Sequence, residues 1–132
     1  LSLTMAARYQ LKVVTEFASA HTLRDYPGAC SRMHGHNWKV ELEAVCTQLD
    51  DIGMGVDFKI MKQAANEVGD ELDHRYLNDL KPFKEINPTA ENIAAYMYKQ
   101  ISARINSDTI EVTALTLWET ERACVRYSEE NL

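Results

Sequence analysis

The chain has 132 residues, of which 14 are basic and 20 acidic, so its formal net charge at neutral pH is −6. That sign is opposite to the footprint of a protein that binds a phosphate backbone, and we therefore expect no direct nucleic-acid partner. No apolar run approaches the roughly 20 residues that span a bilayer, and residues 1–7 lack the basic start and apolar stretch of a signal peptide. We expect no membrane partner and a cytoplasmic location.

Two stretches in the first third of the chain alternate between apolar and polar residues. Residues 9–21 and 34–47 each place β-branched and aromatic side chains on one side and Lys or Glu on the other, which is typical of half-buried strands. The two strands should pair as a long antiparallel hairpin.

Two helical patterns follow, and the chain then returns to strands. Asp57 is a predicted N-cap, as is Thr89 after Pro88. The apolar residues that recur at helical spacing behind these caps are Ile60, Met61, Ala64, Val68 and Leu72, and then Ile93, Tyr96, Met97 and Ile101. Alternation resumes at residues 111–118 and 123–127. The order β-β-α-α-β-β predicts the α+β class, with an antiparallel four-stranded sheet and two helices on one face.

One domain is expected over residues 1–132, because the chain has no repeat, no low-complexity tract and no flexible linker. Residues 1–7 are expected to lie outside its core, as a flexible arm or as residues foreign to the natural chain, with Met5 as a candidate start. The three cysteines show no C-x-x-C spacing, which fits a reducing compartment. A single sheet layer leaves one face and two edges open, so we expect neighbouring subunits to cover them.

Three of the four histidines lie where the first two strands meet. Residues two apart in a strand project from the same face, so His34 and His36 form a bidentate pair on the side of Trp38, and His21 shares a face with Phe17. Three imidazoles without a fourth protein ligand describe a catalytic zinc site with an open position, although iron or nickel suits the same ligands. The alternative is an accidental pair of histidines on a strand.

Cys30 lies four residues before His34, where a nearby cation would favour its thiolate. The thiolate is a candidate base or nucleophile, and an ordinary loop cysteine or a fourth zinc ligand are equal alternatives; Cys46 and Cys124 are expected to be packing residues.

Asp73 and His74 follow the first helix, and an acid beside an imidazole can orient it. Because adjacent side chains rarely bond each other, we expect one to contact the cysteine and the other to support it. Spacing alone favours a histidine that satisfies carbonyl groups at the helix end.

Glu119 ends an apolar strand between Trp118 and Thr120, which is a poor place for a carboxylate without a partner. Its partner is either a structural ion pair with Arg122 or Arg126, or the paired N–H groups of a guanidine-like ligand ring. The sequence alone favours the ion pair.

Five motifs together resemble one family. They are Phe17-Ala-Ser-Ala-His21, Cys30-Ser-Arg-Met-His34-Gly-His36-Asn-Trp38, Leu72-Asp-His-Arg-Tyr-Leu-Asn78, Asn87-Pro-Thr-Ala-Glu-Asn92 and Trp118-Glu-Thr120. In order and with consistent gaps over nearly the whole chain, the set resembles the 6-pyruvoyltetrahydropterin synthase family. The short spacing from Cys30 to His34 is more similar to its 6-carboxytetrahydropterin synthase branch than to the animal-type pyruvoyl enzymes.

The resemblance implies a role for each candidate residue. It implies one zinc ion per subunit at His21, His34 and His36, with Cys30 as general base, Asp73 and His74 as the rest of the proton-transfer set, and Glu119 as the anchor of the pterin ring. Thr89 and Glu91 are implied to hold the pterin of a neighbouring subunit, although Ala90 stands where many relatives carry Ser or Thr. The implied architecture is the tunnelling fold, in which a trimer-based homo-oligomer, such as a hexamer, joins its sheets into a barrel.

The implied reaction is a lyase step toward queuosine that needs no redox cofactor. It converts 7,8-dihydroneopterin triphosphate to 6-carboxy-5,6,7,8-tetrahydropterin and releases acetaldehyde and triphosphate; from position alone, we expect Arg24 or Arg32 to contact the triphosphate. A pyruvoyl-type synthase and a sepiapterin-forming relative remain as enzyme alternatives, which product mass separates. A metal- or pterin-binding module without turnover is the alternative of another class, which the zinc content and activity of Cys30→Ala would separate.

Overall fold

The computed structural model describes residues 5–131, apart from the side chain of Cys30. The expectations for residues 1–4 therefore lie outside the described residues. Along the chain the elements are β1 (Tyr9–His21), η1 (Ala29–Ser31), β2 (His34–Cys46), α1 (Phe58–Leu72), η2 (Leu77–Asp79), η3 (Lys81–Phe83), α2 (Ala90–Ile105), β3 (Ile110–Thr120) and β4 (Ala123–Tyr127). The predicted order of strands and α-helices is confirmed, whereas the short 3-10 helices η1, η2 and η3 were not predicted.

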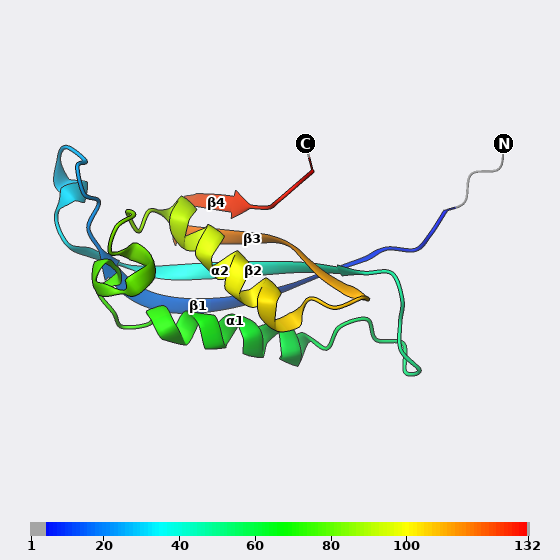
Figure 1. Ribbon diagram of the computed structural model, residues 1–132. Helices are drawn as coiled ribbons and strands as arrows, with labels where there is room; N and C mark the ends of the chain where they lie inside the picture. The colour runs from blue at the N-terminus through cyan, green and yellow to red at the C-terminus, as the bar shows by residue number, and fades with distance from the viewer. Residues whose placement is uncertain (1–4, 132) are drawn as a thin grey trace.

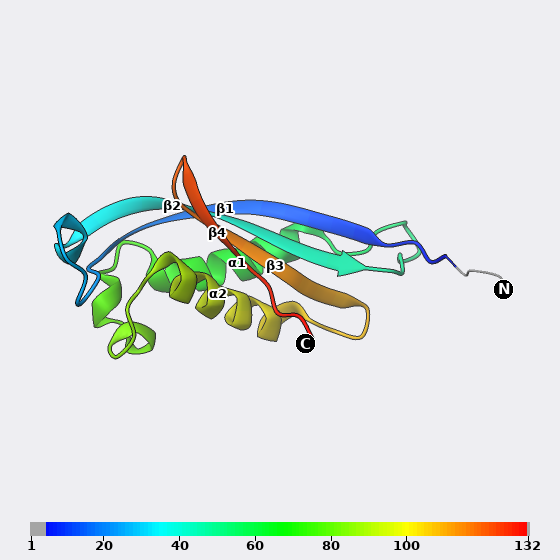
Figure 2. The ribbon, with the colours of Figure 1, turned by 90° about the horizontal axis from the view of Figure 1, so that it is seen from above.

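The strands form one antiparallel sheet in the order β1-β2-β3-β4. The predicted hairpin is confirmed, with β1 and β2 paired in unbroken register from Tyr9↔Cys46 to His21↔His34. Both helices lie on one face of this curved sheet, as Figures 1 and 2 show from two directions. The α+β class and the layer arrangement of the prediction are thus observed.

Each α-helix begins at the cap that the sequence predicted. The Asp57 carboxylate accepts a hydrogen bond from the Lys59 N–H at 2.8 Å, and the Thr89 hydroxyl accepts one from the Asn92 N–H at 3.1 Å. These contacts satisfy N–H groups that the first turn of a helix leaves without an internal partner. One residue of the predicted apolar stripe is misplaced, because Ile60 is 52% exposed.

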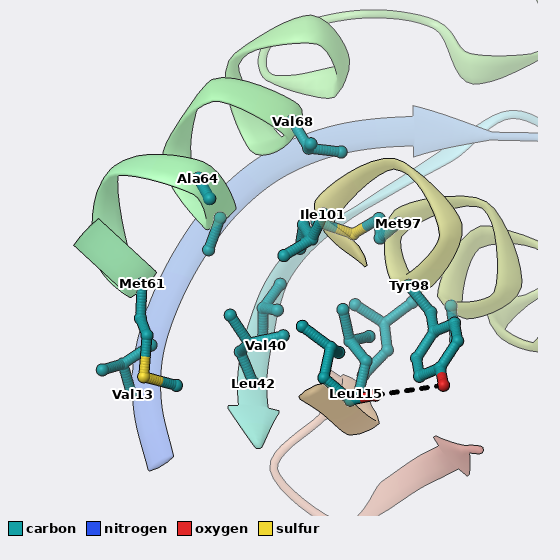
Figure 3. Packing of buried hydrophobic residues seen from close by; sticks show 14 of the residues in the cluster. Val13, Val40, Leu42, Met61, Ala64, Val68, Met97, Tyr98, Ile101 and Leu115 are labelled. Carbon is teal, nitrogen blue, oxygen red and sulfur yellow. Dashed lines mark hydrogen bonds between the residues drawn. The ribbon is translucent and has the colours of Figure 1, made fainter. Parts of the chain in front are cut away.

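The core lies between the helices and the middle of the sheet (Figure 3). Leu42 of β2, Leu115 of β3, Met61 of α1 and Ile101 of α2 are fully buried there. Burial of such side chains is worth about 1.5–3 kcal/mol each before the entropy of ordering the chain is counted. The core therefore holds the strand pair β1–β2 in place, and with it the residues at the end of the pair, where His21 lies opposite His34.

The opposite face of the sheet is polar. Glu43 of β2, only 7% exposed, accepts hydrogen bonds from Gln10 and from Arg126, the latter at 3.1 Å. Two residues earlier in β2, on the same face, Glu41 pairs with Lys12 at 3.2 Å and accepts from Trp118 Nε1 at 3.0 Å. The edges of β1 and β4 remain a reason for neighbouring subunits, although the end of β1 already pairs with the chain after α1, where the Ala20 N–H donates to the Arg75 carbonyl at 3.0 Å. Neither α-helix in residues 5–131 has the length and apolar character to cross a membrane.

Candidate metal centre and active site

Three histidines converge at the end of the hairpin. His21, the last residue of β1, lies directly opposite His34, the first residue of β2, and His36 lies opposite Ser19. One ring nitrogen from each histidine can be chosen so that all three lie within 4.8 Å of one another. The predicted convergence of the three histidines is therefore confirmed, and their side chains are positioned to bind a metal.

Carbonyl groups hold two of the rings. His21 Nδ1 is 2.7 Å from the Pro88 carbonyl oxygen, and His34 Nδ1 is 2.8 Å from the Arg32 carbonyl oxygen. Because a carbonyl oxygen only accepts, each Nδ1 must carry the proton, which leaves the lone pair on Nε2. The two rings are thus prepared to bind a metal through Nε2.

The Nε2 atoms of His21 and His36 are suited to bind a metal because they have no hydrogen-bond partner among the described residues. Within the described part of the chain, His21 Nε2 and His36 Nε2 are buried and have no hydrogen-bond partner. A buried polar atom without a partner costs about 1–3 kcal/mol, and a coordinated cation would remove that cost. Burial is the main cause that lowers the pKa of His21 and of His36, and the neutral imidazole it favours is the form that binds metals.

Glu119 lies beside these histidines, and the predicted ion pair with Arg122 or Arg126 is wrong. Arg126 stands opposite Thr116 on the polar face, where it binds Glu43, so it points away from Glu119. Among the described residues, the charged partner within 4 Å of the Glu119 carboxylate is His36, with Nε2 and Oε1 3.5 Å apart. The Glu119 side chain is 34% exposed and is therefore free to accept from a ligand.

Asp73 and His74 bond each other directly, contrary to the expectation for adjacent residues. Asp73 Oδ2 is 2.8 Å from His74 Nδ1, while its Oδ1 accepts from the Ala18 N–H at 2.8 Å. The reason is the backbone of His74, whose φ of 55° lies in the left-handed region and turns the ring back to the carboxylate. The Ala18 N–H, followed by His74, lowers the pKa of Asp73. The alternative of a histidine that satisfies helix-end carbonyl groups is wrong as well.

An open groove of about 550 Å³ joins the pair to the metal centre. Small residues of the strands, Ala18, Ala20 and Gly35, form part of its wall, and His36 and His74 both line it. The His74 side chain is 82% exposed, so the nitrogen that does not face Asp73 is accessible. The structure thus brings one metal-centre histidine and the predicted proton-transfer histidine to one space.

Three further predicted residues have mixed outcomes. Cys30 lies in η1, just before His34, and its side chain lies outside the described part of the chain, so its role stays a prediction. The Thr89 hydroxyl is engaged as the cap of α2, and the His21–Pro88 contact brings the start of that helix, with Glu91 in its first turn, close to the histidines.

The expectation that Arg24 contacts triphosphate is not supported. Its guanidinium donates to the carbonyl oxygens of Phe83 at 2.7 Å and Ile86 at 3.1 Å, so it anchors the loop that follows α1. Arg32 remains exposed beside the site. Asn78 and Asn87 were predicted only as motif residues, yet their side chains bind the backbone at Thr22 and at Arg24, in the segment that follows His21. A sequence signal was available, because the motifs Leu72–Asn78 and Asn87–Asn92 each contain an asparagine to which no function was assigned.

Comparison with known proteins shows the family of this chain. A sequence profile described as 6-pyruvoyl tetrahydropterin synthase matches residues 10–130. The chain belongs to the 6-pyruvoyl tetrahydropterin synthase family. It is 33% identical over 108 residues to the 6-carboxy-5,6,7,8-tetrahydropterin synthase of Bacillus subtilis, covering 78% of this chain and 70% of the relative. Relatives from Rickettsia and Synechocystis carry the same name, which agrees with the predicted branch.

One further relative and one solved structure carry the name of the pyruvoyl enzyme. The 6-pyruvoyl tetrahydrobiopterin synthase of Dictyostelium discoideum is 34% identical over 105 residues, which is 78% of this chain and 76% of that protein. The structure of the 6-pyruvoyl tetrahydropterin synthase of Caenorhabditis elegans superposes with a TM-score of 0.82 at 24% identity, over 97% of this chain and all of that one. The second likeness establishes the shared tunnelling-fold subunit.

Proposed function

We propose that this family member is a zinc-dependent 6-carboxy-5,6,7,8-tetrahydropterin synthase. It would convert 7,8-dihydroneopterin triphosphate to the carboxy product, with release of acetaldehyde and triphosphate, and so supply a precursor of queuosine in the cytoplasm. The observation that carries the proposal is the convergence of three imidazoles beside the partly exposed Glu119 carboxylate, which lies 3.5 Å from His36 Nε2. The names of the Bacillus and Rickettsia relatives support the choice of product.

His21, His34 and His36 are proposed to hold the metal. Zinc suits three neutral imidazoles with an open position, and when bound it supplies a Lewis acid for the oxygen atoms of the substrate side chain. Glu119, next to His36, is proposed to accept two hydrogen bonds from the amino and ring N–H groups of the pterin. A two-point contact of this kind fixes the register of the ring relative to the metal centre.

Proton transfer is proposed to involve Cys30 and the Asp73–His74 pair. Asp73 is held by the Ala18 N–H and in turn holds His74 Nδ1, which leaves the other ring nitrogen of His74 to accept or donate a proton in the groove. A positioned imidazole is suited to this exchange near neutral pH. The Cys30 thiolate is proposed as the base that removes a proton from the substrate side chain.

Neighbouring subunits are proposed to complete the site. β1 and β4 are the edges of the sheet, and joining the β1 edge of one subunit to the β4 edge of the next would extend the sheet into a barrel without covering its polar face. We propose that the closed assembly is a trimer-based homo-oligomer, such as a hexamer. Thr89 and Glu91, at the start of α2, are proposed to contact the pterin across the interface.

A second candidate, the 6-pyruvoyl product, is favoured by the Dictyostelium relative, whose identity to this chain matches that of the Bacillus enzyme. The test is mass spectrometry of the products after zinc-loaded protein is incubated with 7,8-dihydroneopterin triphosphate, with chelator-treated protein as the control. A carboxytetrahydropterin with acetaldehyde supports the first proposal. A pyruvoyl product would replace the product assignment, and absence of any product would return the chain to the class of binding modules.

A further inference from the structure

Side chains, rather than a strand, hold the chain beyond the end of β1. Asn78 uses both ends of its amide on Thr22: Oδ1 accepts from the Thr22 N–H at 2.9 Å and Nδ2 donates to the Thr22 carbonyl at 2.9 Å. Asn87 repeats this arrangement two residues later, where it accepts from the Arg24 N–H and donates to the Arg24 carbonyl, both at 2.9 Å. Each amide supplies the pair of hydrogen bonds that a residue of a neighbouring strand would exchange.

Asn78 binds Thr22, the residue next to His21, whereas Asn87 is next to the residue whose carbonyl contacts the His21 ring. Asn87 precedes Pro88, whose carbonyl oxygen is 2.7 Å from His21 Nδ1. The Asn87 carbonyl also accepts from Asn92 Nδ2 at 2.8 Å, in the first turn of α2. Asn87 is therefore fixed on one side to the chain that follows His21 and on the other side to α2, with the Pro88 carbonyl between them.

We infer that Asn87 is a positioning residue of the metal centre, which holds the Pro88 carbonyl against His21 so that Nε2 of that ring faces the metal. The hydrogen bond made by one nitrogen of an imidazole sets both the tautomer and the orientation of the ring. His21 is fully buried, so a displaced carbonyl would leave its Nδ1–H without water as a replacement. The inference rests on the metal site of the proposed function and assigns a role to a residue that touches neither metal nor substrate.

Asn78 provides a matched control. Both asparagines make two backbone hydrogen bonds of equal length, and the Arg24 guanidinium ties together the loop between them through the Phe83 and Ile86 carbonyls. Asn78→Ala and Asn87→Ala should therefore reduce resistance to urea to similar extents. They should differ in metal affinity, because only Asn87 positions the Pro88 carbonyl.

The experiment measures zinc affinity of the folded variants by competition with a chromophoric chelator, and the visible absorption spectrum of the cobalt-loaded proteins. Asn87→Ala should bind zinc about 10- to 100-fold more weakly, the usual effect of losing an outer partner of a ligand, and should shift the cobalt spectrum. Asn78→Ala should keep the affinity and spectrum of the wild type. Equal losses in both variants, or unchanged affinity in Asn87→Ala, would overturn the inference.

A measurement on the wild type keeps the test open if Asn87→Ala does not fold. Nitrogen-15 NMR of the metal-free protein should show the Nδ1–H tautomer for His21, and the opposite tautomer would overturn the inference. Failure of the wild type to bind zinc would instead overturn the proposed metal site, and the inference with it. Zinc binding that is unaffected by Asn87→Ala would leave the proposed function standing without this role for Asn87.

Discussion

The helix-covered face of the sheet has two regions of opposite chemical character, an apolar middle and an end that carries imidazoles. In the middle, Leu42 and Leu115 are fully buried in the apolar cluster that also contains residues of both helices. At the end, the same alternation of β1 and β2 brings His21 and His36 to that face, and their Nε2 atoms are buried without a hydrogen-bond partner among the described residues. The apolar middle stabilises the fold, whereas the imidazole end destabilises it slightly because ring nitrogens there have no hydrogen-bond partner in the described part of the chain.

This difference shows how one strand pair serves two purposes. Apolar side chains need only volume and contact, so sequence alternation is enough to place them. Bare imidazoles need defined orientations, and here backbone carbonyl groups of Pro88 and Arg32 supply them from segments outside the sheet. The loops at the end of the sheet therefore help to orient the histidines that are positioned to bind a metal.

The largest effect is expected from His36→Leu, which is close in volume and cannot bind a metal. Turnover should fall about a thousandfold or more, since a Lewis acid contributes several kcal/mol and about 1.4 kcal/mol corresponds to a factor of ten. The free energy of unfolding of the metal-free protein should stay constant or rise by about 1 kcal/mol, because an unpaired buried nitrogen is removed. Zinc content, product formation and urea unfolding with chelator measure these quantities. A less stable metal-free variant would contradict the contrast between the two regions.

Leu42→Ala should have the converse effect. Loss of a fully buried leucine should lower the free energy of unfolding by about 3 kcal/mol, while zinc affinity of the folded fraction stays at the wild-type value. Leu49→Ala, at a leucine that is 43% exposed, is the control and should change the free energy of unfolding by no more than about 0.5 kcal/mol. If zinc affinity fell together with stability in Leu42→Ala, the two regions would not be separable.

Glu119→Gln tests the carboxylate beside the metal centre. Loss of the charge from a two-point contact should lower kcat/KM about 10- to 100-fold, because a hydrogen bond to a charged group is worth about 1.5–3 kcal/mol, and zinc content should not change. Glu43→Gln is the matched control, because that carboxylate is bound by Gln10 and Arg126 on the polar face. It should weaken stability and leave kcat/KM intact. Equal kinetic effects of the two changes would remove Glu119 from the proposed pterin site.

Local patterns were sufficient to predict most of the fold and the histidine cluster. Alternation with a period of two placed Phe17, His21 and His36 on one face, and the caps Asp57 and Thr89 were readable because a cap acts within its own first turn. The family resemblance added the roles of Cys30 and of the Asp73–His74 pair. The role of Cys30 remains a prediction, since its side chain is outside the described part of the chain.

What the sequence could not predict depends on contacts between distant segments. The partner of Glu119 was misassigned because the register of β4, shifted between Trp118 and Thr120, decides that Arg126 faces Glu43 instead. The Pro88 carbonyl carries no side-chain signal, although it fixes His21. The Asp73–His74 contact depends on a left-handed φ at His74, which is uncommon for residues other than glycine and which no sequence pattern indicated.

The smallest effect is expected from Tyr96→Phe, which tests a polar group that is paired rather than bare. The Tyr96 hydroxyl donates to Glu71 at 2.8 Å between the helices, and burial together with Glu71 raises its pKa to about 12. At neutral pH the variant should be less stable by no more than about 1 kcal/mol, because the side chain is partly exposed to solvent.

The pH dependence of that difference has a definite sign. An unfolded tyrosine releases its proton near pH 10, whereas folded Tyr96 keeps it until about pH 12, so the stability that Tyr96 contributes is complete below the first value and is lost as the pH rises toward the second. Urea unfolding of wild type and variant at increasing pH should therefore show the difference shrinking above about pH 10. The pKa values of Tyr98 and Tyr127 are also raised, but both residues are present in wild type and variant, so their contributions cancel in the stability difference. A stability difference that did not change with pH would mean that the Tyr96 hydroxyl is not hydrogen-bonded in solution. Tyr96 could then not serve as the hydrogen-bonded comparison for the unpaired nitrogen atoms of His21 and His36.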